Sequence, residues 1–155
     1  MTESDKLWKT IERELLRAQD IETVVLKSHL LVETQINVAL ESHFGPKIEK
    51  ARLSFSQKLE VLACIWPPLK KKDSSIGPRS LYENWKELNK LRNKIAHQLS
   101  PANMRTLLIE WVTRTLGYRL KTINRTVVLK RNIVKTIVLE VALFSGRIEE
   151  WKNSL

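Results

Sequence analysis

Arg92, Asn93 and His97 are the side chains of this chain whose types and spacing best suit chemistry at a phosphate. Arginine offers a planar, permanently charged fork that matches phosphate oxygens. Histidine titrates near neutral pH, so it can act as a general base or a general acid. Asn93 precedes His97 by four residues, which places both on one face of a helix. Its amide can therefore donate to a phosphate or orient the imidazole.

The helix that carries these residues does not by itself bring them together. At 100° per residue, Arg92 projects about 140° away from His97. Either the helix loosens near His97, or a second copy of the chain completes the site. A structural alternative is also open, in which Arg92 forms a buried ion pair with Glu33. In that case His97 is simply favoured by the helix dipole at the carboxyl end of its helix.

Basic residues accompany the trio along the same helix. Lys86, Lys90 and Lys94 are candidates to hold the phosphates of a nucleic-acid backbone. The whole chain has 27 basic and 17 acidic residues, a net charge of +10, which favours a polyanionic partner. A weaker interpretation of this charge is a basic helical protein that binds nucleic acid without an active site.

Capping residues and helix breakers divide the chain into helices with short connections. A length of 155 residues with few glycines and prolines fits a single domain over residues 1–155. We predict an all-α fold, an antiparallel helical bundle of five or six helices. The predicted helices run over 4–17, 20–44, 54–65, 81–98 and 102–116, followed by a C-terminal helix through Val134 and Trp151. The segment 69–78 is expected to be a loop, and the β-branched run at 126–128 is assigned to the last helix, although an extended form stays open.

Helix 20–44 is apolar over much of its circumference. The expected core face holds five residues: Val25, Val32, Ile36, Ala39 and Leu40. Leu30, Leu31 and Val38 lie off that face, so either a dimer interface or other parts of the chain must cover them. The motif helix shows its own core face, made by Leu81, Leu88, Leu91, Ile95 and Leu99.

Other residue types indicate no competing chemistry. The single cysteine, Cys64, has apolar neighbours and is expected to be a buried, inert thiol in a reducing cytosol. His29, Glu33 and His43 do not have the spacing of a metal site, so neither a metal nor another cofactor is expected. Trp66, beside Pro67 and a lysine run, is a candidate exposed contact. No apolar run approaches the ~20 residues of a membrane span, and no signal peptide is indicated.

The motif and its surroundings resemble a known family. The segment LNKLRNKIAHQL, residues 88–99, resembles the R-x4-6-H helix of HEPN domains, with a polar amide directly after the arginine. The segments SHLLVETQINVALESHFG (28–45) and ARLSFSQKLEVLACI (51–65) are similar to the first long helix and the following helix of compact HEPN proteins. The resemblance covers about residues 20–100. Some toxin members carry a tyrosine two residues after the histidine, where this chain has Leu99.

The resemblance implies a function and partners. Many HEPN proteins of toxin–antitoxin and phage-defence systems are dimers that cleave RNA without metal, using the arginine and histidine of the motif. On this reading Arg92, Asn93 and His97 are catalytic, RNA is the substrate, and an antitoxin or defence protein is a partner in the cytoplasm. Other members are inactive, so the alternative is a non-catalytic HEPN module that binds a partner protein or a nucleotide.

Overall fold

A computed structural model describes residues 2–97 and 100–155 of the chain. Within these residues the chain forms helices and no strand, so the predicted all-α class is confirmed. The elements are α1 (Glu3–Leu16), α2 (Ile21–Phe44), η1 (Pro46–Ala51), α3 (Phe55–Ile65), η2 (Pro67–Lys70), α4 (Leu81–Ala96), α5 (Pro101–Leu116) and α6 (Thr126–Ser154), where η marks a 3-10 helix.

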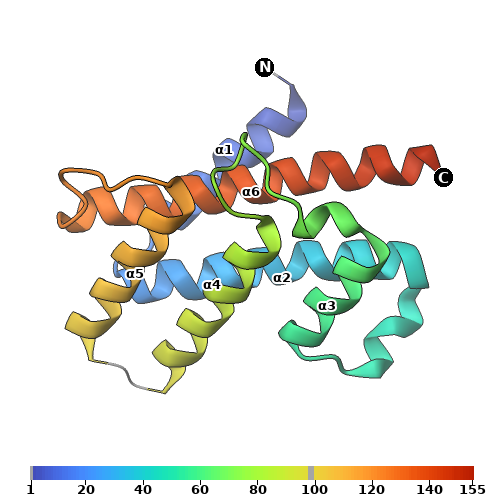
Figure 1. Ribbon diagram of the computed structural model, residues 1–155, viewed down its shortest axis with the longest axis horizontal. Helices are drawn as coiled ribbons and strands as arrows, with labels where there is room; N and C mark the ends of the chain where they lie inside the picture. Colours follow the sequence, from blue (N-terminus) through green and yellow to red (C-terminus); the bar gives the residue numbers. More distant parts are fainter. Residues whose placement is uncertain (1, 98–99) are drawn as a thin grey trace.

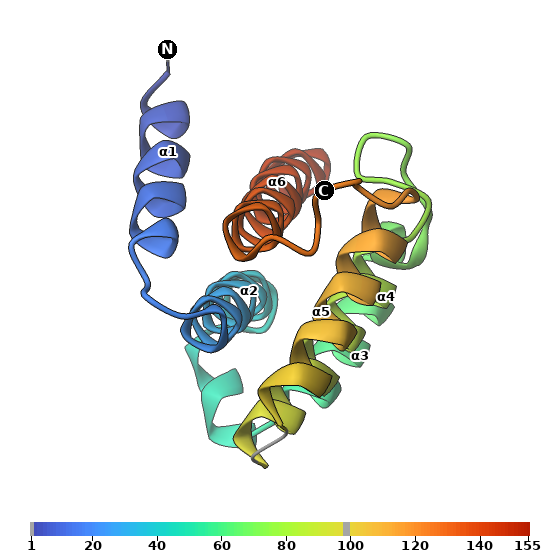
Figure 2. The ribbon, with the colours of Figure 1, turned by 90° about the vertical axis from the view of Figure 1, so that its left-hand side faces the viewer.

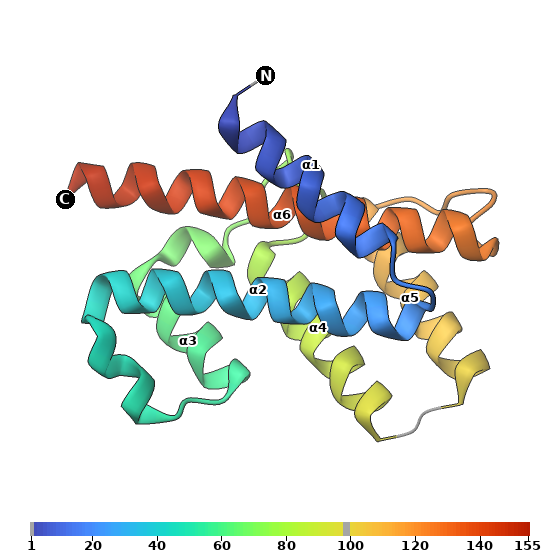
Figure 3. The same cartoon turned by 180° about the vertical axis from the view of Figure 1, so that it is seen from behind.

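The helices form three layers (Figures 1 and 2). The two longest, α2 and α6, pack along each other in the middle layer. The shorter helices α3, α4 and α5 cover one side of this pair and run steeply across it. Helix α1 lies on the other side, where it crosses α6 (Figure 3). This arrangement directs the carboxyl end of α4 away from α6.

Local capping chemistry explains where most helices begin and end. The Asp20 carboxylate accepts a hydrogen bond of 2.6 Å from the Thr23 amide at the start of α2. Ser54 and Gln57 form a capping box at the start of α3, where the sequence predicted a helix from residue 54. Gly117, with φ of 82°, ends α5 in the left-handed conformation that glycine adopts without strain. These boundaries were predicted from the sequence and are confirmed.

The segment that leads into α4 is held by the helices around it. Arg147 of α6 forms an ion pair with Asp73, and this interaction lowers the pKa of that carboxyl to about 2. Gly77 has φ of 143°, and a Cβ there would lie 2.2 Å from the Thr115 carbonyl oxygen of α5. The start of the motif helix therefore has a fixed position against α5 and α6.

The core contains most of the expected residues. All five residues assigned to the core face of α2 are buried, and so are Leu81, Leu88 and Leu91 of α4. Leu30 and Val38 are exposed on α2, whereas Leu31 is half-buried. The open question about residues 126–128 is answered, because α6 begins at Thr126.

Three local expectations need correction, and two lie outside the described residues. Cys64 is exposed, because it lies one turn after Glu60 on the outer face of α3. Trp66 is buried and packs edge-on against Phe144, with ring centroids 5.4 Å apart. The predicted loop 69–78 begins inside η2. The predicted end of the motif helix at 98, and the core position assigned to residue 99, lie outside the described residues.

Candidate functional site

The motif lies in the last turn of α4, at the end that points away from α6 (Figure 1). Helix α4 begins at a capping box, where Ser80 and Glu83 exchange hydrogen bonds. It ends at Ala96. His97 is the C-cap, with φ of −95° and ψ of 23°, and its amide donates to the Asn93 carbonyl at 3.1 Å. Regular helical geometry therefore ends at His97, which keeps the hydrogen bond of the last helical turn.

Arg92, Asn93 and His97 are all exposed. Arg92 Nη1 donates a hydrogen bond of 3.1 Å to Asn93 Oδ1. Asn93 and His97 are one turn apart, so this bond draws the guanidinium from its own side of α4 toward the side that bears the imidazole. The bond thus joins two of the three motif residues, and His97 follows Asn93 by one turn of α4. With Asn93 Oδ1 turned to Arg92, its Nδ2 is left to donate to a ligand.

The alternative in which Arg92 closes a buried ion pair receives no support from the described residues. Glu33 pairs with Lys58 of α3, with 2.7 Å between Nζ and Oε1. Arg92 keeps an exposed guanidinium whose recorded hydrogen bond goes to a neutral amide. A charge held in this way can bind an anion from solution, because no carboxylate of residues 2–97 and 100–155 forms an ion pair with it.

Lys86, Lys90 and Lys94 are exposed along α4. Successive steps of four residues carry Lys86 and Lys90 along the face of Asn93 and His97, whereas Lys94 lies toward the α5 side. Two of the three predicted lysines, Lys86 and Lys90, thus share a face of α4 with Asn93 and His97. Lys94 lies next to that face.

A polar cluster that sequence reasoning did not assemble supports α4 one turn before Asn93. His29 of α2 is buried, and its Nε2 lies 3.0 Å from Asn89 Oδ1. Asn89 Nδ2 donates in turn to Ser56 Oγ of α3 at 3.3 Å. Burial lowers the pKa of His29, and the nearby charge of Arg92 acts in the same direction. His29 is thus a neutral residue of the core.

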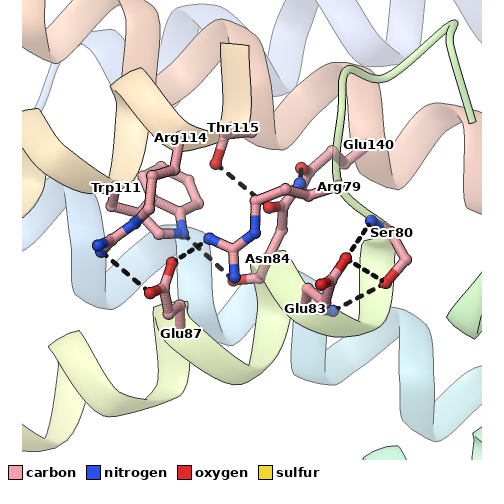
Figure 4. Close-up of polar contacts among 9 residues, drawn as sticks. All are labelled: Arg79, Ser80, Glu83, Asn84, Glu87, Trp111, Arg114, Thr115 and Glu140. Carbon is pink, nitrogen blue, oxygen red and sulfur yellow. Dashed lines mark hydrogen bonds and ion pairs between the residues drawn. The ribbon is translucent and has the colours of Figure 1, made fainter. Parts of the chain in front are cut away.

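The opposite end of α4 is fixed by the buried carboxyl group of Glu140 (Figure 4). Glu140 of α6 is fully buried and accepts hydrogen bonds from Asn84 Nδ2 at 2.6 Å and Trp85 Nε1 at 2.9 Å. Asn84 accepts further bonds from Trp111 and Thr115 of α5. Burial raises the pKa of Glu140 to about 8. The network therefore ties three helices together at one point.

The sequence contains one signal for this network. Glu140 is three residues after Ile137 and four before Phe144, so it occupies a core position of α6. A charged residue at such a position requires buried hydrogen-bond partners. Closer to the surface, Glu87 of α4 pairs with Arg79 and with Arg114, the latter at 3.0 Å, and adds a second link to α5 (Figure 4).

Two further features of the described residues bear on the kind of site. Across 2–97 and 100–155, no three His, Cys, Asp or Glu side chains gather where a metal ion could be held. Over the same residues, no helix has the length and apolarity needed to cross a membrane.

Comparisons with known proteins returned no relative: no family model matches the chain, no curated protein is similar to it, and no solved structure matches its fold. The assignment of chemistry to this site therefore rests on the residues themselves.

Proposed function

We propose that this protein is a HEPN-type endoribonuclease that cleaves RNA without a metal ion and acts as a dimer with a composite Arg/His site. The observation that carries the proposal is the hydrogen bond from Arg92 to Asn93. It joins a cation and an amide on the exposed surface near the end of α4, one turn before the imidazole of His97. That set matches the needs of phosphodiester cleavage.

The proposed reaction is an internal transesterification of RNA. A base takes the proton of a ribose 2′-OH, and the 2′-oxygen forms a bond to the adjacent phosphorus. The bond between phosphorus and the 5′-oxygen of the next nucleotide breaks, and an acid gives that oxygen a proton. The products are a 2′,3′-cyclic phosphate and a free 5′-OH, so atoms and charge balance.

Each motif residue has a role in this scheme. His97 acts as base or acid, and Arg92 holds the non-bridging oxygens while negative charge develops on them. Asn93 positions Arg92 and offers its Nδ2 to the phosphate. Lys86 and Lys90, with Lys94 beside them, bind the flanking phosphates.

A second copy of the chain supplies what one motif lacks. One His97 cannot be base and acid in the same step, whereas a dimer provides two histidines. Leu26, Leu30 and Val38 support such a dimer, because they are 41%, 62% and 51% exposed along one side of α2. At 100° per residue, Leu26 and Leu30 lie about 20° and 60° from Glu33, on the same side of it, whereas Val38 lies about 140° from Glu33. Glu33 pairs with Lys58 of α3, so the two leucines lie nearer to α3 than Val38 does.

The HEPN resemblance suggests the biological setting. We propose a cytoplasmic toxin or a phage-defence nuclease, with an antitoxin or defence protein as its partner. The identity of the neighbouring gene would test this biological setting directly. A gene for an antitoxin or a small nucleotidyltransferase beside this one would support the assignment.

The test is cleavage of single-stranded RNA by the purified protein, with product ends identified by mass spectrometry. We expect 2′,3′-cyclic phosphates, and rates that do not change in EDTA, since side chains supply the acid–base and charge functions. His97→Ala is expected to lower the rate by about 10²–10⁴-fold. Arg92→Ala is expected to lower it by about 10²–10³-fold, the usual cost of losing a transition-state donor.

Matched controls separate chemistry from folding. His43→Ala and Arg131→Ala change the same residue types at other exposed positions, on α2 and α6, and should cleave like the wild type. Circular dichroism should show that all four variants fold. Intact RNA in the presence of well-folded wild-type protein would overturn the nuclease and favour the non-catalytic module.

A further inference from the structure

A second cluster of side chains lies at the opposite end of α4 from the motif. Tyr82 in the first turn of α4 donates its hydroxyl to Glu60 of α3. Lys70 of η2 lies 3.4 Å from Glu60, and its Nζ is 4.5 Å from the centroid of the Tyr82 ring. Lys86 Nζ lies 5.5 Å from the same centroid. Three elements thus contribute an aromatic ring, a carboxylate and two ammonium groups to one place.

Stability of the fold does not explain this cluster well. Tyr82 is half-buried, and the side chains of Glu60 and Lys70 are both more than half exposed. Ion pairs at such positions contribute about 0–1 kcal/mol. Three charged groups around one partly exposed ring are therefore better suited to contact with a ligand than to holding α3 against α4.

The cluster and the motif share one face of α4. At 100° per residue, Tyr82, Lys86, Asn93 and His97 fall within about 60° of one another, with Lys90 at the margin. Tyr82 and His97 are separated by fifteen residues, which is about 22 Å along the helix axis. Lys86, Lys90, Asn93 and His97 are exposed on this face, and Tyr82 is half-buried at its start. A flexible single strand bound at one end can therefore reach the other end past two cations.

The chemistry of the cluster fits an unpaired nucleobase. Aromatic rings bind bases of single strands by stacking, and lysines bind the adjoining phosphates. A carboxylate accepts hydrogen bonds from the exocyclic amino group of cytosine, and adenine carries such a group as well. The hydrogen bond from Tyr82 lowers the pKa of Glu60, so this side chain is ionised at neutral pH and acts only as an acceptor.

We propose that Tyr82, Glu60, Lys70 and Lys86 form a base-binding subsite for single-stranded RNA whose cleaved phosphate lies at the Arg92–His97 motif. This inference rests on the proposed function and adds a substrate class to it. On binding, phosphates draw Lys70 and Lys86 away from the ring, and the base takes their place on it. The Glu60 carboxylate then favours strands that carry amino groups on their bases.

The experiment measures equilibrium binding of fluorescein-labelled 12-nucleotide RNAs by fluorescence anisotropy. It uses His97→Ala protein so that the RNA stays intact, and compares oligo-A, oligo-C and oligo-U with a duplex of equal length. In this background we expect Tyr82→Leu to weaken single-strand binding by about tenfold. Lys70→Ala should weaken it as well. Duplex binding should change little on Tyr82→Leu, because paired bases do not expose their faces.

Matched variants at other exposed positions serve as controls. Tyr118→Leu and Lys121→Ala remove the same residue types on the α5–α6 side of the molecule and should bind within about twofold of the background protein. Equal losses in Tyr82→Leu and Tyr118→Leu would overturn the subsite. Lys70→Ala keeps the test valid even if Tyr82→Leu disturbs the start of α4.

Glu60→Gln distinguishes base recognition from simple charge repulsion. If Glu60 accepts from bases, the variant loses the preference for oligo-A and oligo-C over oligo-U. If Glu60 only repels phosphate, Glu60→Gln binds all three RNAs more tightly by the same factor. That result would contradict the proposed role of Glu60 in the subsite.

The subsite and the nuclease can fail separately. Wild-type protein that leaves RNA intact, while Tyr82→Leu still weakens binding, would remove the nuclease and retain the subsite. Cleavage by the wild type, together with unchanged RNA binding by Tyr82→Leu, would retain the nuclease and remove the subsite. Absence of binding to any of the RNAs would overturn both proposals.

Discussion

Asn89 and Asn93 are one turn apart on α4, yet they have different surroundings. Asn89 is half-buried and is bonded to His29 and Ser56, whereas Asn93 is exposed and bonded to Arg92. The first asparagine joins α4 to α2 and α3. The second belongs to the candidate site. Residue type alone does not separate these roles, because the separation comes from which helix faces each side chain.

Alanine substitutions at the two positions should therefore affect different properties, stability at Asn89 and cleavage at Asn93. Asn89→Ala leaves the buried His29 without its partner, and we expect the free energy of unfolding to fall by about 1–3 kcal/mol. Asn93→Ala removes an exposed amide and should change stability by less than about 0.5 kcal/mol, but it should lower the cleavage rate. Urea unfolding and the RNA assay measure the two effects. Equal destabilisation by both variants would show that Asn93 is structural.

At the scale of the elements, α4 is fixed more firmly at its beginning than at its end. The beginning is tied by Glu140, Asn84 and Trp85, and by the pairs that Glu87 makes. The last turn, with the motif, extends beyond these ties. A rigid scaffold that presents an exposed terminal turn leaves the side chains of that turn accessible to a ligand.

Glu140 should give the fold a characteristic pH dependence. Its pKa is about 8 in the fold against an ordinary value of 4.5, so the folded state binds more protons between these values. The contribution of Glu140 to stability is thus complete below pH 4.5 and is lost as the pH rises toward 8. Between pH 5 and 8, the melting temperature of the wild type should fall relative to Glu140→Gln, which cannot ionise. Parallel melting curves across this range would show that the carboxyl does not titrate there.

The sequence predicted these elements better than it predicted what lies between them. Caps such as Asp20, Ser54 and Gly117 act within a few residues, so they fixed the helix boundaries. The partners of Glu140 are more than fifty residues away, and no local pattern identifies them. The exposure of Cys64 likewise depends on where neighbouring helices lie. The bond between Arg92 and Asn93 depends on a rotamer, which sequence spacing does not determine.

At the scale of the whole molecule, charge and apolar surface suggest two different contacts. The net charge of +10 favours a polyanion, and the exposed cations of α4 give that polyanion a route to the motif. The exposed leucines and valine of α2 lie away from the core and carry no charge. A protein that uses the first surface for RNA and the second for its own copy would bring two motifs to one substrate.

Leu30→Glu tests that arrangement. Leu30 is 62% exposed, so a glutamate there should leave the fold intact but place two like charges in a symmetric interface. We expect wild-type protein at micromolar concentration to sediment at twice the chain mass of 18.1 kDa, and Leu30→Glu to sediment as a monomer with greatly reduced cleavage. Val127→Glu, at an equally exposed position of α6, is the control and should remain dimeric and active. A wild-type monomer that cleaves RNA would mean that one copy of Arg92 and His97 is sufficient. The second proton would then have to come from water or from another residue of the same chain.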